Sequence, residues 1–258
     1  MDKVVYYQGN SLSYTVEETH KPICICLHGM NMSKEMFDVK PLRNLLSQYS
    51  LIQVDLCGYG NSLLDKDTFN MEVFDTLLLE LMKQEQIDNC YICGYCLGGI
   101  FALDFTIRHP SLIKHFIMIE TMIYLPKWLW LCACPGYQTG YYVFQKQTWL
   151  LKILECFPMF TNISHPQRIA ISQSRWNKEV NTFYLKLMRE YEKINHIERC
   201  RTINCSIDII YSQTSFHNVK KTAKDLSIYD FVTIHECQCL GHFLFLDNSL
   251  AKLHLSHN

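Results

Sequence analysis

The sequence predicts an α/β protein with a mostly parallel central sheet, helices on both faces and a helical insertion. Short apolar runs rich in β-branched residues alternate with segments of helical periodicity, a pattern typical of such a sheet. The alternation stops after Glu120 and resumes at Cys205. Because 258 residues suffice for one large core and one insertion, we expect a core of residues 1–120 and 205–258 and a helical cap of residues 121–204.

The expected strands lie in six apolar runs: PICICLHG, SLIQVDLCG, CYICGYC, HFIMIE, SIDIIYS and FVTIHEC. Before them, VVYYQGNSLSYTVEE carries a turn signal at Gly9-Asn10 and predicts a hairpin at an antiparallel edge of the sheet. Helices are expected at residues 33–47, 71–86, 97–109 and 218–227, and in the tail after Phe243. The apolar, aromatic start of the insertion, YLPKWLWLCACPGY, fits either a lid over a hydrophobic pocket or ordinary helix packing.

The composition favours small neutral ligands as partners. Hydrophobic residues make up 48% of the chain, charged residues 19%, and the formal net charge is −1, which gives no electrostatic reason to bind nucleic acid or an anionic membrane. We see neither a leader-like start nor an apolar run of about 18 residues. The expectation is a cytoplasmic protein without stable membrane insertion, and a homodimer is left open.

The thirteen cysteines are interpreted as mostly reduced thiols, because the count is odd and the chain is large. Cys24 and Cys26 lie in an apolar strand where alternate residues face one side, which favours buried small side chains over metal ligands. Cys93 and Cys96 also allow a redox interpretation, but Gly94 and Tyr95 between them are more typical of a turn. No metal and no organic cofactor are predicted.

Four motifs in order carry a resemblance over nearly the whole chain: LHGMNMS, DLCGYGNS, GYCLGG and CLGHFLFLDN. Together they resemble proteins of the α/β-hydrolase fold. The segment GYCLGG is also similar to the cysteine-containing turn of dienelactone hydrolase and to that of polyhydroxyalkanoate synthases, although neither likeness extends beyond the motif. The resemblance implies a nucleophile on a sharp strand-to-helix turn, a histidine after the last strand and an acid that orients it.

Cys96 occupies the nucleophile position of that turn. The strained turn requires small residues two before and two after the nucleophile, and Gly94 and Gly98 stand there. A helix N-terminus favours a thiolate, so cysteine suits the position. The alternative is that Cys96 is a small buried residue in an active site that has lost its function.

The resemblance implies His242, in GHFLFLDN, as the general base and acid. It also implies an oxyanion hole formed by the backbone N–H groups of Met30 and Leu97. In the same motifs, His28 is expected to shape its loop, and Asp55 to hold a turn through backbone hydrogen bonds rather than to act in catalysis.

The position of the acidic residue departs from the pattern usual for proteins of the α/β-hydrolase fold. No Asp or Glu stands near Ser215, where the resemblance would place it, and Asp208 falls inside a strand. Glu120 ends the strand HFIMIE, and MIETMIYLP resembles the segment of some haloalkane dehalogenases whose acid has this relocated position. We therefore expect Glu120 to orient His242; otherwise it is a capping or ion-paired residue.

The chemistry predicted from Cys96, His242 and Glu120 is cleavage of an ester, thioester or lactone of a small apolar substrate through a thioester acyl-enzyme. Two alternatives stay open. One is an acyltransferase that uses the same site, because a thioester can pass its acyl group to an acceptor other than water. The other is an inactive hydrolase-fold protein that binds an apolar ligand.

Overall fold

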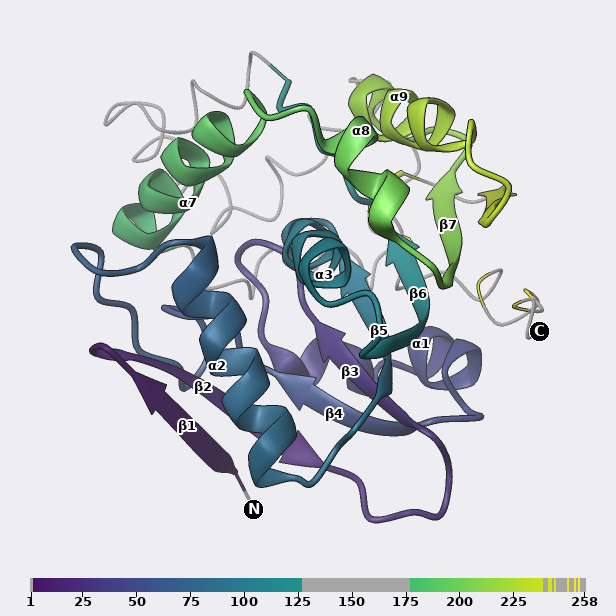
Figure 1. Cartoon of the computed structure of the whole chain (residues 1–258). Coiled ribbons are helices and arrows are strands. Elements are labelled where there is room, and N and C mark those ends of the chain that lie inside the picture. The colour runs from purple at the N-terminus through teal and green to yellow at the C-terminus, as the bar shows by residue number, and fades with distance from the viewer. Residues whose placement is uncertain are drawn as a thin grey trace, which may run out of the picture.

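An eight-stranded sheet runs through the computed structural model (Figure 1). The structure describes residues 2–126 and 177–238, together with residues 241, 242, 244, 250, 253 and 255. The strand order is β1-β2-β4-β3-β5-β6-β7-β8. The strands are β1 (Lys3–Tyr7), β2 (Asn10–Val16), β3 (Ile23–Leu27), β4 (Ser50–Val54), β5 (Cys90–Tyr95), β6 (Ile113–Ile119), β7 (Ser206–Ser212) and β8 (Val232–Cys237).

The pairing confirms the predicted hairpin and the mostly parallel sheet. β1 and β2 pair antiparallel around the turn at Gly9, and β2 pairs antiparallel with β4. All remaining neighbours, from β4 to β8, pair in parallel. The carboxyl ends of these parallel strands therefore meet along one edge of the sheet, where ligand sites of open α/β sheets form.

The described helices are η1 (Lys34–Asp38), α1 (Lys40–Leu45), α2 (Met71–Gln84), α3 (Leu97–Arg108), α7 (Lys178–Tyr191), α8 (His196–Arg199), η3 (Cys200–Thr202) and α9 (His217–Leu226). Those at the four described positions where a helix was expected lie within a few residues of the predicted bounds. The single helix expected at residues 33–47 is two, with extended backbone at Val39 between them. Pro41 explains the break, because proline has no N–H to continue a helix and is tolerated in the first turn of a new one.

Strands β3 to β7 bury alternate residues in two separate cores. Ile25 and Leu27 of β3 pack with α2 and α3 on one face, whereas Cys24 and Cys26 pack with α1 on the other. Figure 1 shows α2 and α3 in front of the sheet and α1 behind it. The cysteines of β3 thus fill the core as small apolar residues, as the alternation predicted.

Most of the predicted cap, residues 121–204, lies outside the described residues, as does the helix expected after Phe243. Of the cap, the structure describes residues 121–126 and a second part that begins at Asn177 and holds α7, α8 and η3. The side chain of Asn177 caps α7 by accepting from the Val180 N–H. The division into core and cap stays a prediction. Within the described parts of the chain, no helix has the length and apolar character needed to cross a bilayer.

Candidate active site

Cys96 lies between the end of β5 and the start of α3, in a backbone conformation that few residues adopt. Its φ is 49° and its ψ is −109°. Its N–H donates to the carbonyl of Ile119 at the end of β6, at 2.9 Å, which holds this strained residue against the neighbouring strand. The structure therefore gives Cys96 the sharp strand-to-helix turn expected of a nucleophile position.

Two glycines make the turn possible, because they let neighbouring backbone segments pack closely around it. A Cβ on Gly98 would lie 2.1 Å from the carbonyl oxygen of Leu27, and one on Gly94 would lie 2.4 Å from the Cα of Gly99. Both obstacles are backbone atoms, which cannot rotate away. The requirement for small residues on each side of Cys96 is therefore steric.

Cys96 differs from the other described cysteines in its exposure. It is partly exposed, whereas the eight other described cysteines are buried, and all nine are free thiols. Burial raises the pKa of the Cys200 thiol to about 12 and that of Cys205 to about 11. Among the described thiols, Cys96 is thus the one open to a substrate or an alkylating reagent.

Glu120 and His242 lie next to each other at the same edge of the sheet. Glu120 is fully buried directly after β6, with a φ of 49°. One of its oxygens, Oε2, is 3.0 Å from His242 Nδ1. An ionised carboxylate only accepts, so Nδ1 carries the proton of this bond and Nε2 is left for another partner. The hydroxyl of Tyr95 donates to the carbonyl oxygen of His242 and fixes its backbone.

Three hydroxyl residues lie where the family resemblance would place the acid: Ser212 at the end of β7, and Thr214 and Ser215 in the loop after it. The Ser212 N–H donates to Glu120 Oε1 at 2.6 Å, and the Ser215 hydroxyl donates to the same oxygen. The Gly241 N–H, next to His242, donates to the hydroxyls of Ser212 at 3.0 Å and Thr214 at 2.7 Å. This loop therefore holds both the buried carboxylate and the segment that carries the histidine.

The surroundings of His242 favour its protonated form. Burial opposes the charge, but the Cys96 sulfur and the Glu120 carboxylate, through charge and hydrogen bonding, outweigh it and raise the pKa of His242 to about 10. The Phe216 ring lies beside the imidazole, with ring centroids 5.0 Å apart. The ring is thus an imidazolium at neutral pH, held between two groups that can be negatively charged.

The loop after β3 passes directly beside Cys96. A Cβ on Gly29 would lie 3.3 Å from the Cβ of Cys96. His28 shapes this loop: its Nδ1 bonds the Gly29 carbonyl at 2.7 Å, and its Nε2 accepts from the Leu56 N–H at 3.0 Å. Burial lowers the pKa of His28, in line with a neutral ring that donates on one side and accepts on the other. Met30 follows in this loop, partly buried.

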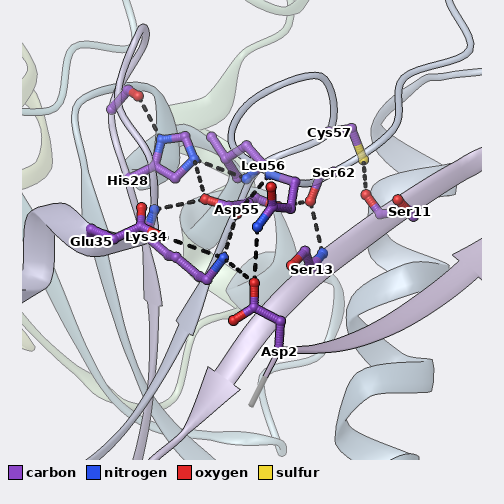
Figure 2. A network of polar contacts seen from close by, with 12 residues as sticks. Asp2, Ser11, Ser13, His28, Lys34, Glu35, Asp55, Leu56, Cys57 and Ser62 are labelled. Atoms are coloured by element: carbon purple, nitrogen blue, oxygen red, sulfur yellow. Dashed lines mark hydrogen bonds and ion pairs between the residues drawn. The ribbon is translucent and has the colours of Figure 1, made fainter. Parts of the chain in front are cut away.

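Asp55 joins the loops after β3 and β4, as Figure 2 shows. Its carboxylate accepts from the Lys34 N–H at 2.8 Å, the Lys34 Nζ at 2.8 Å and the Asn61 N–H at 3.0 Å. Gly60, with a φ of 53°, leaves room for it, because a Cβ there would lie 2.2 Å from the carboxylate. Asp55 therefore holds the turn as expected.

Asp208 is part of a different cluster. Its carboxylate is 3.0 Å from His115 Nε2 and 2.7 Å from His235 Nε2, and it is fully buried within β7. The other candidate acid, Glu120, lies 3.0 Å from His242. The described residues contain no group of three or more His, Cys, Asp or Glu side chains placed to hold a metal ion.

Sequence reasoning did not foresee the contacts of Tyr95, Ser212, Thr214 and Ser215. The sequence carried a signal for the loop after β7, because the position usually held by an acid carries Ser215 within the polar run SQTS. For Tyr95 there was no such signal, since a tyrosine at the end of a buried strand is usually a core residue.

Comparisons with known proteins support this picture of the fold. One curated relative is a probable 1-acylglycerol-3-phosphate O-acyltransferase from Oryza sativa subsp. japonica, which is 26% identical over 115 residues, or 43% of this chain and 27% of its own length. Another is a pimeloyl-[acyl-carrier protein] methyl ester esterase from Nitrosospira multiformis, which is 28% identical over 102 residues, or 39% of this chain and 38% of its own length. The chain spans between 27% and 46% of the lengths of the curated relatives it matches.

A solved structure, the enol-lactonase from Burkholderia xenovorans LB400, superposes with a TM-score of 0.72 over 94% of both chains at 13% identity. Both the esterase and the enol-lactonase are hydrolases. The family model described as alpha/beta hydrolase fold matches residues 22–155. Since this match spans just over half of the chain and the predicted fold is present, the chain belongs to the α/β-hydrolase-fold family.

Proposed function

We propose that the chain is a hydrolase that cleaves an ester, thioester or lactone of a small apolar substrate through a thioester on Cys96. The observation that carries this proposal is the arrangement of three residues at one edge of the sheet. Cys96 is partly exposed on a strained turn, the pKa of His242 is raised by Cys96 and Glu120, and Glu120 lies 3.0 Å from His242. A nucleophile, a base and a residue that orients the base are the parts that covalent catalysis requires.

In the first half of the reaction, the Cys96 thiolate attacks the carbonyl carbon and the carbonyl electrons move to oxygen. The N–H groups of Met30 and Leu97 are proposed to bind this oxyanion. When the oxyanion collapses, the bond to the leaving group breaks, and the leaving oxygen or sulfur takes the proton from His242. A thioester on Cys96 and a neutral His242 remain.

In the second half, His242 takes a proton from water as the water oxygen attacks the thioester carbonyl. Collapse of the second oxyanion breaks the C–S bond and releases the acid. Cys96 then leaves as a thiolate beside the imidazolium, which restores the starting state. Glu120 keeps the proton of Nδ1 in place throughout and stabilises the charged ring.

In this scheme acyl transfer differs from hydrolysis only in the acceptor, because an alcohol, thiol or amine can replace water in the second half. The curated relative named as a probable acyltransferase matches 43% of the chain. Transfer would appear as a product that forms only when an acceptor is added. The substrate, the cytoplasmic location and a homodimer are further proposals of the same account.

The proposal is tested by burst kinetics with p-nitrophenyl esters of increasing chain length. We expect a burst of p-nitrophenol that is lost in Cys96→Ala and strongly slowed in His242→Ala and Glu120→Gln. Asp208→Asn is the matched control, because it also neutralises a buried carboxylate that contacts histidines. Equal rates in wild type and Cys96→Ala would instead favour a hydrolase-fold protein that only binds ligands.

A further inference from the structure

Three polar side chains link α7 to the loop that carries Met30. The Asn181 Nδ2 donates to Asn31 Oδ1 at 2.6 Å, and the Tyr59 hydroxyl donates to Asn181 Oδ1 at 2.6 Å. The ring of Tyr59 also packs edge-on against His28, with centroids 5.6 Å apart. Three segments that are distant in sequence, at residues 28–31, 59 and 181, therefore meet at one point beside Cys96.

The two hydrogen bonds of Asn181 would be costly to lose, and their geometry is specific. Asn181 is fully buried, so both its amide donor and its acceptor need partners, and it finds them in Asn31 and Tyr59. Asn31 has a φ of 61°, a left-handed conformation in which an asparagine needs support from its surroundings. Its peptide directly follows Met30, so the conformation of Asn31 sets the path of the chain at Met30.

We propose that Asn181 is a positioning residue: through Asn31 it holds the loop after β3 so that the Met30 N–H points at the oxyanion. This inference rests on the proposed function of Cys96 and goes beyond it, because it makes α7 part of the machinery. A displacement of this helix would loosen the oxyanion hole while leaving Cys96 and His242 in place.

The test compares two reactions of Cys96, of which only one forms an oxyanion. Acylation by p-nitrophenyl butyrate passes through an oxyanion, whereas alkylation by iodoacetamide displaces iodide from carbon and forms none. We expect Asn181→Ala and Asn31→Gly to slow acylation about 10- to 100-fold, the range for a misplaced or lost oxyanion donor, with KM little changed. Their alkylation rates should stay close to wild type. Asn31→Gly keeps a residue that tolerates positive φ and serves if Asn181→Ala fails to fold.

Tyr184→Phe is the matched control. Tyr184 lies on the same helix and donates to the Cys57 carbonyl at 2.7 Å, so its variant also removes a buried bond of α7 but none to the loop after β3. It should leave both rates close to wild type.

Three outcomes contradict the proposal. Acylation at the wild-type rate in Asn31→Gly and in folded Asn181→Ala overturns it. So does a parallel fall of acylation and alkylation, since that places the effect on Cys96 and His242. A wild type that is alkylated at Cys96 but never acylated overturns the proposed function itself, and the inference with it.

Discussion

At the level of single residues, Cys96 and His242 interact through charge and hydrogen bonding. The pKa of His242 is raised to about 10 because the Cys96 sulfur and the Glu120 carboxylate outweigh the effect of burial. A free histidine titrates near 6.5, so the folded chain keeps this ring charged over the whole neutral range. An imidazolium beside a sulfur stabilises the thiolate, which is the form that attacks a carbonyl.

The first prediction concerns the pH dependence of alkylation. Because His242 keeps its proton until the pH rises through about 10, iodoacetamide alkylation of Cys96 should depend less steeply on pH between about pH 6 and pH 9 in the wild type than in His242→Ala. That variant lacks the imidazolium beside Cys96, so its rate should rise more steeply with pH. Peptide mass analysis assigns the alkylated cysteine. A wild-type profile as steep as that of His242→Ala would show that the charge of His242 does not affect the reactivity of Cys96.

The second prediction concerns the acid. Glu120→Gln should lower kcat/KM for p-nitrophenyl butyrate by about 10²- to 10⁴-fold, because a neutral amide neither stabilises the imidazolium nor fixes its tautomer. The Ser215 hydroxyl bonds Glu120 and stands at the usual place of the acid. The double variant Glu120→Gln/Ser215→Asp should therefore recover part of the activity. Full activity in Glu120→Gln would remove Glu120 from the mechanism.

At the level of elements, the approach of α3 to β3 decides whether the Cys96 turn can form. A third prediction follows from two glycines that differ in their neighbours. Gly98→Ala should lower the free energy of unfolding by about 3 kcal/mol, because its Cβ would meet the backbone of Leu27. Gly29→Ala should cost about 1 kcal/mol or less, since the nearest atoms there are side chains at 3.2 Å or more. Urea unfolding measures both, and equal costs would contradict the steric account.

The cluster of Asp208, His115 and His235 joins strands β6, β7 and β8. Burial opposes ionisation of Asp208, but hydrogen bonds and charge from the two histidines outweigh it and hold the pKa of this carboxyl well below its usual range. A carboxyl with a lowered folded pKa stabilises the fold above its unfolded pKa, near 4, and this stabilisation is lost as the pH falls through the folded pKa.

A fourth prediction follows for this cluster. Asp208→Asn should lower the free energy of unfolding at pH 7 by about 3 kcal/mol, and the difference from wild type should shrink as the pH falls below about 4. Urea unfolding at several pH values measures it. A difference that is constant down to pH 2 would show that charge plays no part.

The elements were largely predictable from the sequence because most of their signals are local. Apolar runs with β-branched residues marked six strands, and Gly9-Asn10 marked the hairpin. Pro41 was also visible, yet the break at Val39 was missed, because the apolar periodicity continues across it. The contact of Glu120 with His242 was expected only through a resemblance, since 122 residues separate them in the sequence. The bonds of Ser215, Tyr95 and Asn181 depend on tertiary packing, which local patterns do not contain.

At the level of the whole molecule, the sheet gathers residues from distant parts of the chain at one edge. Cys96 follows β5, Glu120 follows β6, the loop with Thr214 and Ser215 follows β7, and His242 comes after β8. The parallel order of these strands brings their carboxyl ends together. α7 adds Asn181 to the same edge. The fold thus supplies a rigid frame, and the chemistry depends on a few residues at the strand ends.

The measurement that tests the central claim most directly is the intact mass of the protein after brief mixing with p-nitrophenyl butyrate at neutral pH. We predict one added butyryl group in the wild type, mapped to the peptide that contains Cys96, a lower yield in Glu120→Gln and none in Cys96→Ala. Asp208→Asn should label like the wild type wherever it is folded. A wild type without the adduct, or an adduct that persists in Cys96→Ala, would contradict covalent catalysis by Cys96.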